Sequence, residues 1–169
     1  MDLYEAIVSR RSVRSFLDRP VEDDKLQRVL KAFQAAPTGR NLQEYKLVVV
    51  RDPSRREDLS RACDQPYVAQ APVVVTLLAT NPQRMMACGV PAAPVDGAIA
   101  LDHLSLAATA EGLGTCWIGH FPQGLCRRLL NAPETAQVIE LMLVGYPADQ
   151  PVPRQRKGLD DLVCHESFE

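Results

Sequence analysis

The chain has 169 residues, of which 46% are hydrophobic and 24% are charged, and its formal net charge is -2 at pH 7. This length and composition are those of one globular domain with a substantial core, so we expect a single domain over residues 1–169. With 19 basic and 21 acidic side chains, the protein has no overall positive field that would draw it to nucleic acid or to an anionic membrane.

The cysteines and the N-terminus bear on the compartment. The five cysteines are odd in number, widely scattered and in no C-x-x-C pair, so neither a disulfide framework nor a zinc site is indicated. Asp2 and Glu5 stand where a signal peptide carries bases, and no apolar run reaches the roughly 18 residues of a membrane-spanning helix. We therefore expect a soluble protein of the reducing cytoplasm with no membrane partner.

The first half of the chain carries the patterns of three helices and two strands. Apolar residues at helical spacing predict a short helix over residues 2–10 and an amphipathic helix over residues 22–35. Runs of β-branched residues predict buried strands over residues 47–50 and 73–78, and the charged segment 54–61 between them predicts an exposed helix.

The second half centres on one apolar helix. Residues 81–95 contain three prolines and two adjacent methionines, which predict a mobile loop or a broken helix. Asp96 is predicted to cap a helix over residues 97–111, whose alanines and leucines require burial inside the monomer or against a partner. The remaining elements are expected to be a strand or turn over 115–119, the start of a short helix over 126–130 and a strand over 138–144. This order predicts an α+β layered fold around a central sheet.

Two short basic segments are the main chemical signal. Arg10-Arg11-Ser12-Val13-Arg14 and Arg154-Gln155-Arg156-Lys157 lie about 140 positions apart. Either segment alone is typical of a solvated surface. Because guanidinium groups and a hydroxyl suit a phosphate, the two together suggest one anion held from both sides, and a cofactor phosphate is the natural candidate.

Other catalytic signatures are missing from the sequence. The common phosphate-loop, dinucleotide, metalloprotease and serine-hydrolase motifs are absent. His103, His120 and His165 lie far apart and have no nearby pattern of acids or cysteines, so we expect no metal site and no catalytic triad.

Further short motifs follow the first arginines in a fixed order: Pro37-Thr38-Gly39-Arg40-Asn41, Gly112-Leu113-Gly114-Thr115-Cys116-Trp117-Ile118-Gly119 and Gly145-Tyr146-Pro147. With them the chain resembles the nitroreductase family of FMN-dependent oxidoreductases, in its short form, over essentially its whole length. The resemblance implies a three-layer α+β sandwich with a central, mainly antiparallel sheet flanked by helices. It also implies a homodimer with shared flavin sites, in which segment 153–169 is an extended arm reaching the partner subunit.

The resemblance assigns roles to individual positions. The first basic segment corresponds to residues that hold the FMN phosphate and ribityl chain, and the second to residues that close over the phosphate; the choice among Arg154, Arg156 and Lys157 stays open. The turn at 37–41 corresponds to one that the second subunit places against the flavin, and the backbone at Ile118 and Gly119 to a segment near flavin N5. The residues predicted to bind FMN are Arg10, Arg11, Ser12, Arg14, Pro37, Thr38, Gly39, Asn41, Gln65, Trp117, Ile118, Gly119, His120, Arg154 and Arg156.

The implied reaction is a ping-pong hydride transfer. FMN accepts a hydride from NADH or NADPH and then reduces an acceptor such as a nitroaromatic or a quinone, so no catalytic side chain is required. Two alternatives stay open: a desaturase or dehalogenase type of family member, differing in the loop at 81–95, and a flavin-binding module without turnover. One departure concerns the turn, because Gln43-Glu44-Tyr45 stands where many members have Gln-Pro-Trp.

Overall fold

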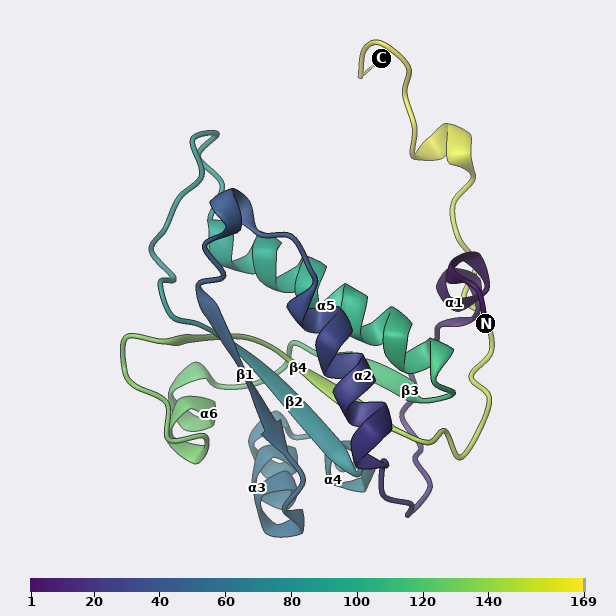
Figure 1. Ribbon diagram of the computed structural model, residues 1–169, viewed down its shortest axis with the longest axis vertical. Helices are drawn as coiled ribbons and strands as arrows, with labels where there is room; N and C mark the ends of the chain where they lie inside the picture. Colours follow the sequence, from purple (N-terminus) through teal and green to yellow (C-terminus); the bar gives the residue numbers. More distant parts are fainter. Residues whose placement is uncertain (169) are drawn as a thin grey trace.

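The computed structural model describes residues 1–168, and in this part of the chain four strands form one antiparallel sheet (Figure 1). The strands are β1 (Tyr45–Val50), β2 (Val73–Ala79), β3 (Gly114–Ile118) and β4 (Gln137–Gly145). Their spatial order is β1-β2-β4-β3, so β2 and β4 are central and β3 is an edge strand. Every residue of β2 is buried, as expected of a strand covered on both faces.

Helices cover both faces of the sheet. On one face α2 (Asp23–Gln34) and α5 (Ala92–Ala110) pack against Val75, Leu77 and Met142. On the other face α3 (Pro53–Cys63), α4 (Tyr67–Gln70) and α6 (Gln123–Leu129) pack against Val74, Leu78 and Leu143. Because successive side chains of a strand point to opposite faces, the apolar strands supply both cores at once. The α+β fold predicted from the residue patterns, and the three-layer sandwich implied by the family resemblance, are confirmed.

Helix α1 and the start of the C-terminal segment lie on the same side of the molecule (Figure 1). Helix α1 (Leu3–Ser9) begins with a capping box between Asp2 and Glu5, and it buries only Ala6. After residue 150 the chain is largely exposed and irregular apart from the short turn η2 (Leu159–Asp161), and Figure 1 shows this segment leaving the body as a tail.

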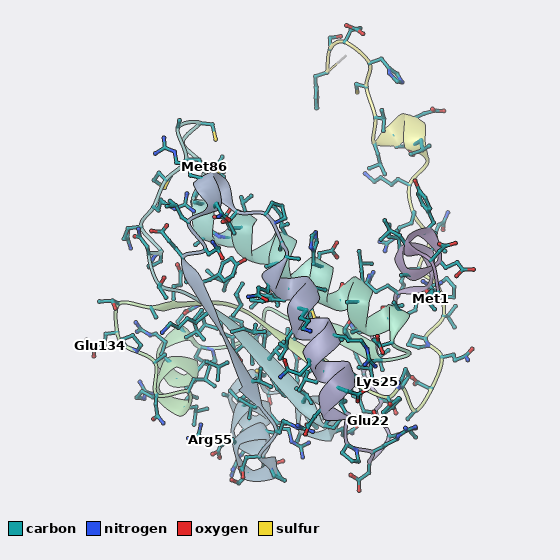
Figure 2. All side chains as sticks on the ribbon, viewed as in Figure 1. Met1, Glu22, Lys25, Arg55, Met86 and Glu134 are labelled. Atoms are coloured by element: carbon teal, nitrogen blue, oxygen red, sulfur yellow. The ribbon has the colours of Figure 1, made fainter. Side chains whose placement is uncertain are left out.

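Two helix starts differ from the prediction. Asp96 is not the N-cap of the long helix, because α5 begins at Ala92 after Pro91 and places Asp96 in its second turn. Pro94 permits this early start, since the first-turn amide that it lacks has no helical partner anyway. The preceding loop therefore ends at residue 91, with Met86 near its tip (Figure 2).

Helix α6 also begins earlier than predicted, at Gln123 in place of Cys126. The Gln123 amide exchanges two hydrogen bonds with the backbone of Val138, which ties the first turn of α6 to β4. Helix α4 was not predicted, because four residues are too few for a periodic pattern.

Candidate functional site

The first basic segment is pinned to the edge of the sheet. The chain leaves α1 at Arg10, Ser12 pairs with Thr115 in a parallel bridge, and the Val13 amide donates to the Thr115 carbonyl at 2.8 Å. The Val13 side chain is 3% exposed. This arrangement fixes the backbone of residues 10–14 beside β3.

The structure brings the two basic segments to one cleft. The cleft has a volume of about 1290 Å³ and is lined by Ile7 and Val8 of α1, by the polar residues of the first basic segment, by Asp102 and Leu106 of α5, and by residues 151–156. Its lining includes Arg10, Arg11, Ser12, Arg14, Arg154 and Arg156. Two segments that are remote in sequence thus face the same space, and its size suits a mononucleotide cofactor.

The arginines in the cleft differ in what already engages them. Arg11 folds back on α1, where its Nη1 donates to the Val8 carbonyl at 2.6 Å and to the Arg10 carbonyl at 2.9 Å. Such contacts stabilise a helix C-terminus. Within residues 1–168, no ion pair or side-chain hydrogen bond engages Arg10, Arg14, Arg154 or Arg156. These four guanidinium groups are therefore free to bind an anion.

The positive field of the first segment reaches β3. Burial raises the pKa of the Cys116 thiol, while the nearby Arg14 and Arg10 oppose that rise. Cys116 lies directly before Trp117, which is half-buried against the α2/α5 side of the core. Ile118 is buried, whereas Gly119 and His120 are exposed where the chain leaves the sheet. The predicted ring-edge segment therefore begins as a buried strand and ends as accessible backbone.

A carboxyl group lies beside Gly119. A Cβ atom at Gly119 would be 3.5 Å from Oε1 of Glu140, which belongs to the neighbouring strand β4. Burial raises the pKa of Glu140, and no cation in residues 1–168 pairs with it. The accessible backbone at the end of β3 thus has a desolvated acid next to it.

The predicted turn at 37–41 does not join the cleft within one chain. The Gly39 amide donates to Asp96 Oδ1 at 3.0 Å, near the start of α5, whereas the cleft contacts Asp102 and Leu106 further along that helix. Figure 1 shows the same separation, with the turn η1 (Gly39–Asn41) beside the first turns of α5 and α1 near its other end. Pro37, Thr38, Gly39 and Asn41 can therefore meet the cleft only if a second copy supplies them.

Gln65 also lies outside the lining of the cleft. It occupies the link between α3 and α4, where its carbonyl accepts from Ser60 Oγ at 3.0 Å and its side chain accepts from the Tyr67 hydroxyl. No contact in the described chain joins it to the basic segments.

Sequence reasoning missed several polar groups. Asp102 was detectable as one of two acids within the most apolar helix of the chain. The ion-pair cluster of Glu44, Arg84 and Asp96 had no local signal, since its members are 40 and 12 positions apart. No group of three or more metal-ligating side chains occurs in residues 1–168.

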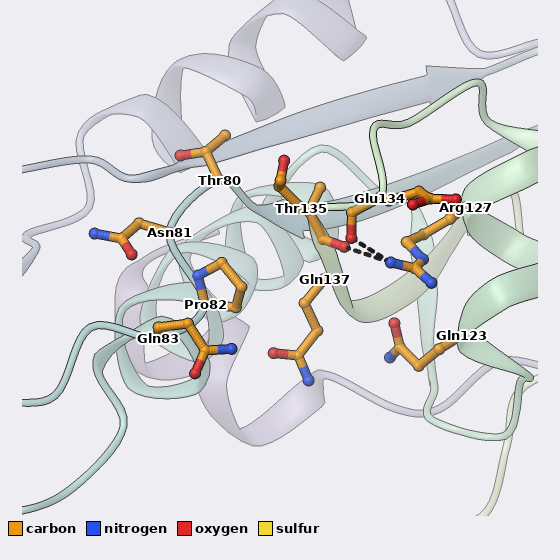
Figure 3. A pocket seen from close by; sticks show the side chains of 10 residues that line it. Thr80, Asn81, Pro82, Gln83, Gln123, Arg127, Glu134, Thr135 and Gln137 are labelled. Carbon is orange, nitrogen blue, oxygen red and sulfur yellow. Dashed lines mark hydrogen bonds between the residues drawn. The ribbon is translucent and has the colours of Figure 1, made fainter.

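A second, smaller pocket lies away from the cleft, beside the end of β2 and the start of β4. Figure 3 shows this pocket of about 590 Å³ between the loop after β2, helix α6 and the start of β4. Its Arg127 guanidinium is held by the backbone carbonyls of Glu134 and Ala136, and most of its other side chains are neutral amides or hydroxyls. None of the predicted cofactor residues lines it, so it does not suit a phosphate as the cleft does.

Comparison with known proteins decides the family. The family model described as "Putative TM nitroreductase" matches residues 2–169. The chain belongs to the nitroreductase family. The FMN reductase [NAD(P)H] of Bacillus subtilis is 30% identical, over 99% of this chain and 74% of that protein. The NADH dehydrogenase of Thermus thermophilus is 31% identical, over 96% of this chain and 95% of that protein.

A solved structure shares the fold of this chain. The NADPH:FMN oxidoreductase from Vibrio harveyi complexed with NAD⁺ superposes with a TM-score of 0.90 at 26% identity, over 99% of this chain and 78% of that chain. The family predicted from the ordered motifs is confirmed. Within residues 1–168 of this chain, no helix combines the length and apolar character needed to cross a membrane.

Proposed function

We propose that this nitroreductase-family protein is an FMN-dependent oxidoreductase that uses NADH or NADPH to reduce a small electron acceptor such as a nitroaromatic or a quinone. The names of its relatives support this activity, since they include an FMN reductase [NAD(P)H] and an NADPH:FMN oxidoreductase. The observation that carries the proposal is the cleft in which Arg10, Arg14, Arg154 and Arg156 face one space without carboxylate partners.

The donor set of the cleft fits a phosphate monoester. A dianionic phosphate is best held by several guanidinium groups and a hydroxyl, which Arg10, Arg14, Ser12 and the second basic segment supply. The backbone of Arg10, Ser12 and Arg14 is fixed by the pairing of this segment with β3. Binding of the phosphate therefore costs little conformational entropy in this segment. Asp102 in the same cleft is an acceptor, which suits the hydroxyl groups of a ribityl chain and not the phosphate.

The ring would lie along the exposed end of β3. When bound, FMN supplies a ring nitrogen that accepts a hydride from the nicotinamide and delivers it to the acceptor. The backbone amides of Ile118 and Gly119 are suited to donate at that edge, and Gly119 has no side chain to obstruct it. No side-chain nucleophile is required.

We infer that the working unit is a homodimer with two shared sites. The exposed stripe of α5 contains Val95, Ala98 and Ile99, and α1 exposes Leu3, Tyr4, Ile7 and Val8. The tail adds exposed apolar residues, Leu159, Leu162, Val163 and Phe168, which fit an arm laid on a second copy. A symmetric pair would also supply each cleft with the turn at 37–41 that its own chain holds elsewhere.

An anaerobic absorbance spectrum tests the activity. Purified protein is mixed with FMN and then with NADH or NADPH in the absence of oxygen. Bleaching of the flavin band near about 450 nm is expected, because the hydride chemistry is that of the cofactor. A bound flavin that never bleaches would favour a binding module. A flavin bleached only by a substrate that becomes desaturated would favour a desaturase type, and a reduced flavin that is reoxidised by a halogenated compound with release of halide would favour a dehalogenase type. We also propose that the protein is cytoplasmic, because its five cysteines are free thiols, which persist in a reducing compartment.

A further inference from the structure

The turn between α2 and β1 has an unusual backbone. Arg40, Asn41 and Gln43 all adopt positive φ angles, of 56°, 56° and 50°, although none is glycine. This left-handed conformation crowds the Cβ atom against the backbone, so it persists only where surrounding contacts enforce it. Arg40 and Asn41 are both exposed at the outside of the turn. The structure must therefore contain groups that hold the turn in place.

Arg84 is the group that joins both ends of this turn. Its Nη2 lies 2.6 Å from Asp96 Oδ2, and its Nε pairs with Glu44 Oε2 directly after the turn. The other oxygen of Asp96 accepts from the Gly39 amide at 3.0 Å. A Cβ atom at Gly39 would be 3.3 Å from Arg84 Nη1, so the turn packs directly on the guanidinium.

The cluster is withdrawn from solvent. The side chains of Arg84, Glu44 and Asp96 are 18%, 27% and 6% exposed. A hydrogen bond from Asn81, followed by the hydrogen bond and the charge of Arg84, holds the pKa of Glu44 below its usual range, against burial and the neighbouring charge of Asp96. Without Arg84, two carboxylates would repel each other in a poorly hydrated space. The turn could relieve that repulsion only by moving.

We propose that Arg84 is a positioning residue for the flavin site of the partner subunit, because it fixes the turn that presents Thr38 and Asn41. This inference rests on the proposed function, in which a second copy brings the turn to the cleft. Arg84 itself touches neither the flavin nor a substrate in this arrangement.

Substitution of Arg84 tests the inference. Arg84→Met keeps the length of the side chain and removes the guanidinium, and Arg84→Lys keeps the charge but cannot reach both carboxylates with a planar fork. Arg28→Met is the control, since Arg28 likewise bonds two acids, Asp24 and Glu111, at the other end of α5, with a side chain that is 48% exposed. FMN affinity by fluorescence quenching and the visible circular dichroism of bound FMN are measured for each variant.

We expect Arg84→Met to raise the Kd for FMN by about tenfold and to alter the visible dichroism, with Arg84→Lys intermediate. Anaerobic flavin reduction by NADH should slow by up to about 10²-fold, because a small misplacement of the reacting groups can reduce the rate by that factor. Arg28→Met should match the wild type in all three. Wild-type affinity and dichroism in Arg84→Met, or in Arg84→Lys if Arg84→Met does not fold, would overturn the inference while leaving the proposed function intact. A wild type that takes up no FMN would overturn both.

Mixed dimers test whether the turn acts in the partner. In a heterodimer of one Arg10→Ala chain and one Arg84→Met chain, one site combines the intact arginine with the intact turn, and the other site carries both defects. At an FMN concentration that leaves both mutant homodimers largely empty, the heterodimer should bind one FMN for every two chains. If it stays as empty as the homodimers, the turn serves its own chain and the inference is wrong.

Discussion

A Cβ atom at Gly114 would lie 2.5 Å from Cγ2 of Val13, closer than real Cβ contacts allow. Gly114 starts β3, and Val13 is the buried residue in the middle of the first basic segment. The absence of a side chain at Gly114 therefore lets the arginine segment lie against the sheet, which couples the packing of the core to the geometry of the cleft.

Gly114→Ala is expected to damage both stability and cofactor binding. The added methyl group must displace Val13, and such overpacking costs about 1–3 kcal/mol. Urea denaturation should show this loss, and the Kd for FMN should rise because Arg10 and Arg14 move with Val13. Gly124→Ala is the control, since its Cβ would meet only the end of Arg128 at 3.5 Å and alanine favours a helix. Equal FMN affinity in Gly114→Ala and Gly124→Ala would contradict the coupling.

The arginines of the cleft are expected to differ in importance. Arg10→Ala or Arg14→Ala removes a free guanidinium and should weaken FMN binding by about 1.5–3 kcal/mol. Arg11→Ala should weaken it less, because the Arg11 guanidinium already bonds the carbonyls of Val8 and Arg10. Fluorescence titrations at two salt concentrations measure these differences, and the loss should shrink at high salt. The phosphate is misplaced if neither Arg10→Ala nor Arg14→Ala changes the Kd.

Local patterns predicted the layers of the fold but not the contacts between distant segments. The apolar run at 73–78 was sufficient to predict a buried strand, because burial on both faces leaves no alternation, but its central place in the sheet came only from the structure. Asp96 was misassigned as a cap because its real partners are the Gly39 amide and Arg84, and the first of these is 57 positions away. A carboxylate before an apolar helix has the same local pattern in both roles.

Some residues of the candidate site could likewise be predicted from local sequence, and others could not. The two arginine segments carried a chemical signal of their own, and the resemblance to a family supplied their common ligand. Glu140 carried no such signal in the sequence. An acid inside the apolar pattern of a strand does not indicate which residue of the neighbouring strand it will lie beside. Its position beside Gly119 follows only from the register of β3 and β4.

Glu140→Gln is expected to change how stability depends on pH. Burial raises the pKa of Glu140 in the folded protein above its unfolded value, so the folded state holds this proton more tightly. In the wild type, the folded state is therefore most stable, relative to the unfolded chain, at pH values below the pKa that Glu140 has in the unfolded chain. This stability is lost as the pH rises through the pKa that Glu140 has in the folded protein. Glutamine has no proton to lose. The free energy of unfolding of Glu140→Gln, relative to the wild type, should increase from pH 4 to pH 8 in urea titrations. Parallel profiles for the two proteins would contradict this assignment.

Ile99→Asp is expected to break the dimer and, with it, the flavin site. Ile99 is 37% exposed on the apolar stripe of α5, and a carboxylate there would be buried unpaired against a second copy. Size-exclusion chromatography with light scattering should show a monomer, and its Kd for FMN should rise because each cleft loses the turn of the other chain. Arg55→Asp on α3, in the opposite layer of the sandwich, should leave both the mass and the Kd unchanged. A monomeric Ile99→Asp protein that binds FMN as tightly as the wild type would show that one chain holds a complete site.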